Sequence, residues 1–397
     1  MKEIEGGITS VPGIRATGVA SGIKATGAKD LVLIVCDEIA TAAGTFTSNK
    51  VKSAPVLVSM ERIKSGKAQA VVANSGNANA CTGEQGLQDA RRMAEIAGNE
   101  LKISSELVLV ASTGKIGRTM PMDKVESGIK FAVSQLSYTG GHEAAQAIMT
   151  TDTFQKEVAV EFDIQGKKAH IGGMVKGAGM INPNMATMLC FMATDVSIDQ
   201  SLLQEALKTA VDRSFNMVCV DGDMSTNDTV IILATGKAGN DKINQHNDDY
   251  NIFLDALTYS TTKLAKMIAK DGEGATKFIE LQIKGAKTEQ DARISAHAIS
   301  RSPLLKCALF GEDPNWGRIM SSLGSSGIDM DQNAVDIWLD DLKIVENGIT
   351  TGFKEESAKD VLKKSEYNIT IDLKVGNAQA TLWTCDLSYD YVKINVV

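Results

Sequence analysis

The sequence predicts a mixed α and β protein built from more than one packed subdomain, and three observations point to this class. The chain has 397 residues, with 43% hydrophobic and 23% charged residues, which is enough apolar material for a large core and more chain than one core usually covers. Short apolar runs bounded by Gly, Asn and Ser indicate strands. Between them, longer stretches carry apolar residues at helical spacing.

The first 85 residues are expected to form strands and turns. Four runs predict strands, and turn-forming residues separate them: 31–40 (LVLIVCDEIA), 42–49 (AAGTFTSN), 54–60 (APVLVSM) and 68–83 (AQAVVANSGNANACTG).

The middle of the chain alternates between the two periodicities. Helices are expected over Gln88–Leu101 and over 122–136, where Pro121 supplies a helix-starting proline. Strands are expected over 156–164 and 167–175, followed by a Gly-rich turn (KGAGMINPN) and an apolar run (MATMLCFMATDVSI).

The remainder continues this alternation and closes with an α+β unit. The patterns predict a helix over Ser201–Ser214, a strand over 229–236 and a long helix over Ile252–Lys270 that ends at the glycine of DGEG, which places Glu273 just past a helix end. From about residue 280 onward, the patterns predict a helix over Gln290–Ser300 and strands over 277–285, 335–345, 368–376 and 378–386.

Charge and composition exclude several classes of partner. The net charge is -8, and Lys and Arg are scattered rather than clustered, so neither nucleic acid nor an anionic membrane is an expected partner. The N-terminus has no signal-type apolar region and no segment is long enough to span a membrane, so we expect a cytoplasmic protein. The six cysteines are far apart and are expected to be reduced and mostly buried.

The search for a catalytic group leads to a threonine. His142, His170, His246 and His297 have no partner spacing, and there is no HExxH or Walker motif, so we expect no metal and no bound cofactor. The segment 172–191 (GGMVKGAGMINPNMATMLCF) contains four glycines and a proline just before an apolar strand, a setting that would hold Thr187 rigidly. An N-terminal threonine carries its own base, an α-amine with a pKa of roughly 7.7–8.0, but only if the Ala186–Thr187 bond is cut. From spacing alone, Thr187 is better explained as an ordinary β-branched strand residue.

The same segment closely resembles the self-cleavage region of the ornithine acetyltransferase family, also called the bifunctional arginine biosynthesis ArgJ family. Further segments resemble the family in family order: VPGIRATGVASGIK, NSGNANACTG, VLVASTGKIG, IMTTDT, VDGDMSTND, DGEGATKF, LFGEDPNWGRI and CDLSYDYVKIN. The resemblance covers nearly the whole chain. It implies a layered α-β-β-α sandwich of the self-cleaving type with a C-terminal α+β unit.

The resemblance also assigns roles to individual residues. It implies that Thr187 is the nucleophile, that the chain is cut between Ala186 and Thr187, and that Thr113 and Gly114 form the oxyanion hole. It further implies substrate contacts at a set of positions in both halves of the chain: Thr150, Lys176, Thr187, Glu273 and Asn395.

Two positions depart from the family pattern. Met224 stands where a threonine is expected in the segment DGDMSTND, which would alter local packing. The chain ends at Val397, whereas family members usually continue to a polar residue that joins the site, so that contact has no counterpart here.

The implied reaction moves acetyl from N2-acetylornithine to glutamate by a ping-pong cycle, and some family members also accept acetyl-CoA as the donor. The cut would give chains 1–186 and 187–397, with about 187–279 completing the N-terminal sandwich and about 280–397 forming the C-terminal unit. The family commonly assembles these chains as α2β2. Two alternatives remain from the residues themselves: a self-cleaving aminopeptidase or amidase of similar fold, and an uncleaved, inactive binding homologue.

Overall fold

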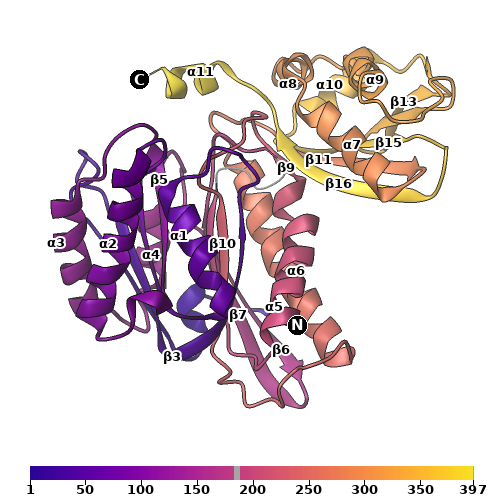
Figure 1. Cartoon of the computed structure of the whole chain (residues 1–397). Helices are drawn as coiled ribbons and strands as arrows, with labels where there is room; N and C mark the ends of the chain where they lie inside the picture. The colour runs from indigo at the N-terminus through magenta and orange to yellow at the C-terminus, as the bar shows by residue number, and fades with distance from the viewer. Residues whose placement is uncertain (183–187, 397) are drawn as a thin grey trace. The chain divides into compact units, whose positions relative to one another are not determined.

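The structure is a computed structural model that describes residues 1–182 and 188–396. The chain divides into two compact units (Figure 1). Unit 1 comprises Met1–Gly177, the described part of Asn184–Phe215, and Met224–Leu264. Unit 2 comprises the described part of Ala178–Pro183, Asn216–Asp223 and Ala265–Val396.

Unit 1 contains a nine-stranded sheet in the order β1-β6-β7-β8-β10-β3-β4-β5, with β2 paired to β3. Its strands are β1 (Lys2–Glu3), β2 (Ile14–Val19), β3 (Leu31–Phe46), β4 (Lys67–Asn77), β5 (Val108–Lys115), β6 (Lys156–Ile164), β7 (Lys167–Lys176), β8 (Leu189–Thr194) and β10 (Thr229–Ala234). Its helices are α1 (Ala54–Arg62), α2 (Gly83–Leu101), α3 (Met122–Ser134), α4 (Gly141–Ile148) and α5 (Gln200–Arg213), and α6 (Asp248–Lys270) begins in this unit.

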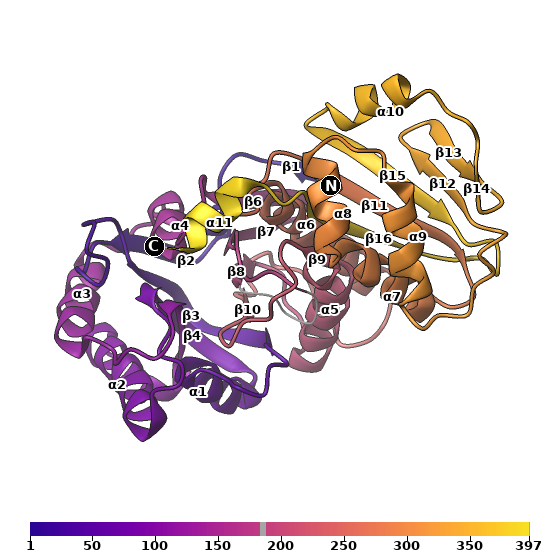
Figure 2. The same cartoon turned by 90° about the horizontal axis from the view of Figure 1, so that it is seen from above.

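Both faces of this sheet are buried, which explains why β3 is a continuous apolar run. Leu31 and Leu33 point into one core cluster with residues of α1, α2 and α3, whereas Val32 and Ile34 point into the other with residues of α4. Side chains alternate between the two faces of a strand, so a strand with helices on both sides needs apolar residues at every position. Helices α1, α2 and α3 lie side by side in both views (Figures 1 and 2). This layered arrangement confirms the α/β class that the sequence predicts.

Unit 2 contains a seven-stranded sheet in the order β14-β13-β12-β15-β11-β16-β9. Its strands are β9 (Val218–Cys219), β11 (Phe278–Ala286), β12 (Asp336–Leu339), β13 (Leu342–Glu346), β14 (Ile349–Thr350), β15 (Glu366–Asp372) and β16 (Ala378–Cys385). Its helices are α7 (Glu289–Ser300), α8 (Pro303–Phe310), α9 (Trp316–Gly324), α10 (Glu355–Leu362) and α11 (Tyr389–Asn395).

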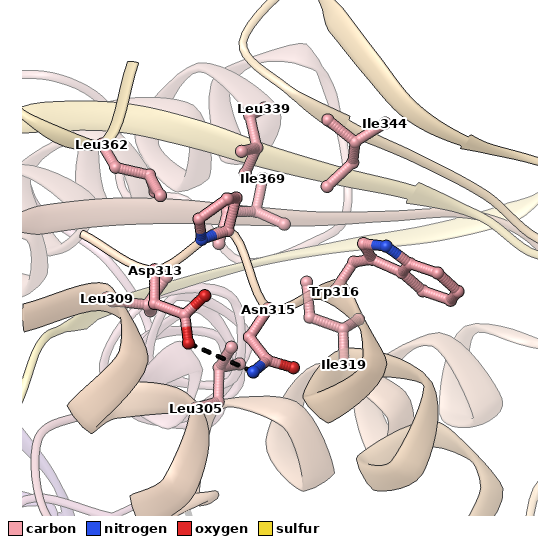
Figure 3. Close-up of a pocket in the computed structure, with 11 residues that line it drawn as sticks. Leu305, Leu309, Asp313, Asn315, Trp316, Ile319, Leu339, Ile344, Leu362 and Ile369 are labelled. Carbon is pink, nitrogen blue, oxygen red and sulfur yellow. Dashed lines mark hydrogen bonds between the residues drawn. The ribbon is translucent and has the colours of Figure 1, made fainter. Parts of the chain in front are cut away.

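Helix α7 packs directly on β11 and β16, and α8 and α9 pack beside it. An apolar pocket between α8, α9 and the sheet is lined by leucine and isoleucine side chains, with Asn315 donating to Asp313 at its edge over 3.1 Å (Figure 3). Because almost no polar groups converge there, this pocket is part of the core of unit 2 and not a site for a polar substrate.

Most of the expected elements are present, but the prediction for residues 54–60 is wrong. They form helix α1 and not a strand. The run APVLVSM is rich in β-branched valine, which favours a strand locally. Pro55 in the first turn starts a helix, and Ser59 and Arg62 then reach β5: the Ser59 hydroxyl donates to Val110 O and Arg62 Nη1 to Val108 O.

Two strand predictions are also corrected in their extent. Residues 31–40 and 42–49 were expected as separate runs, but Leu31–Phe46 is a single strand with an irregularity in its pairing to β4 between Val35 and Ala40. Residues 335–345 form the hairpin β12–β13, because Asp340 has φ of +47° and turns the chain back. Helices α4, α8, α9, α10 and α11 were not predicted.

None of the helices in the described residues is long and apolar enough to cross a membrane.

Candidate active site

The end of strand β5 carries both predicted oxyanion residues. Thr113 is buried and Gly114, the next residue, is exposed. Gly114 lies opposite Gly76 of β4 where the strand register becomes irregular, and its φ is +134°. A Cβ at this position would lie 2.3 Å from the carbonyl carbon of Gly76, so only glycine fits. The structure therefore places a buried threonine hydroxyl beside an exposed glycine at the end of β5.

An asparagine network fixes the backbone just before Thr113. Asn227 Nδ2 donates to the carbonyl oxygens of Ala78 (2.6 Å) and Ser112 (2.7 Å). The Ser112 hydroxyl donates to Asn74 Oδ1 over 2.6 Å. Buried networks of this kind hold a site rigid when every member is paired. The segments NSGNANACTG and VDGDMSTND, for which no chemical role is predicted, thus support the end of β5 that carries Thr113.

Lys176 is brought next to Thr113 by the fold. It is the last residue of β7, is only 2% exposed, and its Nζ lies 3.5 Å from Thr113 Oγ1. A hydroxyl that accepts from a lysine keeps its own hydrogen available for another acceptor. The register pairs Lys176 with Leu189 of β8, so this lysine lies across from the strand that follows Thr187 in sequence.

Thr150 lies near the same group through a buried carboxylate that the sequence did not single out. Asp152 Oδ2 accepts the N–H of Thr150 at 2.9 Å, and Oδ1 accepts the N–H of Gly177 and the Nζ of Lys156, each at 2.7 Å. Burial alone would raise the pKa of Asp152, but the charges of Lys176 and Lys156 outweigh it and lower the pKa to about 2. Asp152 is therefore a carboxylate at neutral pH.

Ala186 and Thr187 lie outside the described residues, but the residue that follows them is well defined. The N–H of Met188 donates to Asp228 Oδ1 at 3.0 Å, and the Met188 carbonyl accepts the N–H of Thr229 at 3.1 Å. Asp228 is fully buried and its Oδ2 has no partner among the described residues. Burial raises the pKa of Asp228 well above its usual value. The sequence did not identify this carboxyl, which lies far from Thr187 along the chain.

Unit 2 holds the other two predicted substrate residues together. Asn395, on helix α11, donates from Nδ2 to Glu273 Oε2 at 2.6 Å. Glu273 follows α6, as expected, and its N–H donates to the carbonyl of Ala178 at 2.9 Å. A Cβ on Gly179 would lie 2.3 Å from the Glu273 carboxyl carbon. Glu273 is thus held by Gly179 beside its carboxylate, by the side-chain amide of Asn395 and by the backbone carbonyl of Ala178.

Replacing Gly179 by alanine should move Glu273 away from Asn395, because the added methyl group would overlap the carboxylate. We expect the KM for the substrate to rise, as we also expect for Glu273→Ala. Little loss of stability is expected, because the overlap is with the end of a flexible side chain. Steady-state kinetics of both variants test this. Gly324→Ala is the control, because nothing lies within 4 Å of a Cβ there and its φ is not positive. Equal kinetics in Gly179→Ala and this control would contradict the expectation.

The chain just before the undescribed segment is also firmly held within unit 2. Asp221 accepts the N–H groups of Met180 (2.6 Å) and Ile181 (2.9 Å). Asn182 donates to the carbonyl of Gly222 at 2.6 Å and accepts from Arg301 Nε at 2.8 Å. The segments on both sides of residues 183–187 are therefore anchored by side chains that are distant in sequence.

Among the described residues, none of the four histidines pairs with Thr113, Thr150, Lys176, Glu273 or Asn395. His142 bonds to Glu157, His170 to Asp195, and His246 lies near Glu205. Burial, together with the charges of Arg301 and Arg293, lowers the pKa of His297 to about 3. In the described parts of the chain, no group of His, Cys, Asp and Glu side chains is placed to hold a metal ion.

The cysteines and Met224 occupy ordinary structural positions. All six cysteines are free thiols, and four are buried, as predicted, while Cys81 and Cys307 are exposed. Met224 Sδ accepts the Ser48 hydroxyl at 3.5 Å, and its carbonyl accepts Asn49 Nδ2 at 3.1 Å. The methionine at this position thus packs against residues 48 and 49.

Comparison with known proteins adds evidence of family. A family model described as the ArgJ family matches residues 15–397. A protein of Caldanaerobacter subterraneus subsp. tengcongensis named "Arginine biosynthesis bifunctional protein ArgJ" is 52% identical over 399 residues, covering 100% of this chain and 99% of that protein. A Bacillus anthracis protein of the same name is 44% identical and covers 98% of this chain and 96% of its own length. Among solved structures, a chain of the protein of this name from Bacillus halodurans is 42% identical, with a TM-score of 0.50, and the match covers 52% of this chain and 97% of that chain.

Proposed function

The chain belongs to the ArgJ family, and from this premise we propose that it is a self-cleaving acetyltransferase of arginine biosynthesis with Thr187 as its nucleophile. The acetyl group moves from N2-acetylornithine to glutamate. The observation that carries the proposal is the arrangement at the end of β5, where the buried hydroxyl of Thr113 contacts Lys176 and the exposed peptide of Gly114 follows it.

Self-cleavage is the first use of this arrangement. The Oγ of Thr187 attacks the carbonyl carbon of Ala186, and the proton passes to the departing nitrogen of Thr187, so the amide becomes an ester. Water then hydrolyses the ester, which leaves a carboxylate on Ala186 and a free amine and hydroxyl on Thr187. The negative charge on the carbonyl oxygen is stabilised by the Thr113 hydroxyl and the Gly114 N–H.

The length of the solved relative supports a cut near the middle of the chain. The Bacillus halodurans chain is matched over 97% of its length by 52% of this one. That chain is therefore about half as long as this one, as one of two cleavage products would be. The anchored segments at 180–182 and at Met188 supply what a self-cleaving chain needs, because each side of the cut keeps its own contacts.

Acetyl transfer reuses the same groups. The α-amine of Thr187 takes the proton of its hydroxyl as Oγ attacks the acetyl carbonyl, and it returns a proton to the departing amine of ornithine. The acetyl ester on Thr187 is then attacked by the amine of glutamate, which forms N-acetylglutamate and frees the hydroxyl. One amide replaces another, so the cycle requires neither a metal nor a bound cofactor.

The charged residues suit an amino-acid substrate with an ammonium side chain. We assign the α-carboxylate of acetylornithine to Lys176 and its distal ammonium to Glu273, with Thr150 and Asn395 as further contacts. Acetyl-CoA is a second acetyl donor in this proposal. We also assign the two chains to an α2β2 assembly in the cytoplasm.

The decisive experiment measures acetyl transfer from N2-acetylornithine to glutamate by the purified protein, with the intact mass recorded in parallel. We expect two chains and transfer that requires glutamate. Hydrolysis of acetylornithine at an equal rate without glutamate would instead indicate an amidase, and a single full-length mass without turnover would indicate an inactive binding protein. Replacing acetylornithine by acetyl-CoA tests the second donor.

Lys176→Ala should raise the KM for acetylornithine more than it slows self-cleavage. Lys176 supplies the cation for the substrate carboxylate, whereas the scissile peptide has no such carboxylate to bind. Kinetics and a mass time course on the same preparation measure both effects. An equal loss in the two would show that Lys176 acts mainly through its contact with Thr113.

A further inference from the structure

A buried carboxylate joins the two segments that carry the proposed substrate contacts Thr150 and Lys176. Asp152 and Lys156 are both completely buried at their side chains and form an ion pair at 2.7 Å. Removing two charges from water is costly, and a buried pair by itself adds little stability. A buried pair that also binds neighbouring backbone groups therefore points to a role in fixing geometry.

The other described hydrogen bonds of Asp152 are made with these two segments. Oδ2 accepts the N–H of Thr150 itself, and Oδ1 accepts the N–H of Gly177, which belongs to the peptide group that follows Lys176. These segments are 26 residues apart along the chain, since one follows α4 and the other ends β7. The Asp152 carboxylate thus fixes the position of the Thr150 segment relative to the end of β7.

The head of Lys176 is influenced by the same carboxylate. The charge of Lys176 favours the ionised form of Asp152, and so does that of Lys156. By reciprocity, the Asp152 charge stabilises the ammonium of Lys176 in its buried position. The same Lys176 ammonium also contacts Thr113, with Nζ lying 3.5 Å from Oγ1.

Resting on the proposed function, we propose that Asp152 is a positioning residue for acetyl transfer, which holds Thr150 and the Lys176 ammonium in the geometry that binds the amino-acid substrate. Asp152 accepts hydrogen bonds from Thr150, Gly177 and Lys156, and it also interacts with the charge of Lys176. It does not itself need to contact the substrate. Its loss should therefore weaken substrate binding and leave the chemistry at Thr187 largely intact.

The matched control is Asp195, which directly follows β8 and contacts β7 near the end opposite Lys176. Asp195 is also buried and accepts the N–H of His170 at 2.6 Å and the His170 ring at 2.7 Å. His170 is six residues before Lys176 on β7, or roughly 20 Å away at about 3.3 Å per residue. Asp195→Asn thus removes a similar buried carboxylate from the far end of the strand.

The experiment compares Asp152→Asn with Asp195→Asn in the full-length protein, by intact mass, thermal unfolding, and kcat and KM for acetylornithine. We expect both variants to cleave, and Asp152→Asn alone to raise KM by about tenfold or more, with kcat within about threefold of wild type. If Asp152 acts through Lys176, the fold increase in KM of the double variant Asp152→Asn/Lys176→Ala will be well below the product of the fold increases of the two single variants. Equal KM values in Asp152→Asn and Asp195→Asn, or multiplicative effects in the double variant, would overturn the inference.

Two further measurements keep this test decisive. If Asp152→Asn does not fold, Asp152→Asn/Lys156→Met removes the buried charge together with its ion-pair partner, and the same KM increase is expected. If the wild-type protein transfers no acetyl group, the proposed function fails. If the wild-type enzyme transfers acetyl but the Asp152 variants keep a normal KM, the positioning role of Asp152 is refuted and the proposed function is not.

Discussion

Replacing Thr187 by alanine is expected to leave a single uncut chain and to reduce acetyl transfer by at least about 1000-fold, as loss of a nucleophile typically does. Alanine lacks the hydroxyl that attacks Ala186, and without the cut the α-amine that serves as base never forms. Among the described residues, His142, His170 and His246 are each paired with a carboxylate, and burial is the main cause that lowers the pKa of His297 to about 3. Intact mass and an acetyl-transfer assay measure the two losses.

Thr187→Ser is the informative companion variant. Serine keeps both the hydroxyl and, after cleavage, the amine, so we expect two chains and measurable transfer. A cut chain in Thr187→Ala would show that another residue attacks Ala186. Transfer by an uncut Thr187→Ala protein would refute the N-terminal nucleophile altogether.

Replacing Gly114 by alanine is expected to produce the second largest effect. The added Cβ would lie 2.3 Å from the carbonyl carbon of Gly76 and 2.5 Å from the nitrogen of Asn77, on a backbone with φ of +134°. Because these contacts are with backbone atoms, β4 and β5 must separate locally, and the Gly114 N–H moves with them. Loss of one oxyanion donor costs about 10²–10³ in kcat, and self-cleavage should slow together with transfer.

Gly117→Ala separates strain from the loss of the donor. Gly117 also has a positive φ, +78°, but nothing lies within 4 Å of a Cβ there. Both variants carry the cost of an unfavourable backbone conformation, and only Gly114→Ala disturbs the end of β5. Similar kcat values and cleavage rates in the two variants would exclude Gly114 from the oxyanion hole.

The contrast between Gly114 and Thr150 illustrates how differently the predicted residues are supported. Gly114 has a conformation that explains why no other residue can stand there. Thr150 is exposed, and its described contact is made by its backbone N–H with Asp152. Its role as a substrate contact therefore rests on the family position, and the Asp152 variants test it through the same segment.

Periodicity and turn residues by themselves determined the order of most elements. The strands β6 and β7 and the helices α2, α3, α5, α6 and α7 lie where their patterns predict them. These elements bury continuous faces, so the apolar spacing records their structure directly. The strand prediction for α1 is wrong, because the short apolar run Val-Leu-Val at 56–58 is compatible with either a strand or a helix. Only its packing against β5 decides between the two.

The chemistry of the site is predicted through the family resemblance of the motifs around Thr113, Lys176, Thr187 and Glu273. Only the tertiary structure revealed the groups that hold these residues: Asn227 beside Ser112, Asp228 on Met188, and Asp152 between Thr150 and Gly177. A carboxylate or amide in a loop has no periodicity, and its role depends on which backbone groups the sheet register brings within about 3 Å of it. Pairing of β6 with β7 brings Asp152 close to Gly177, and pairing of β8 with β10 brings Asp228 close to Met188. A single sequence does not encode strand pairing as a local signal.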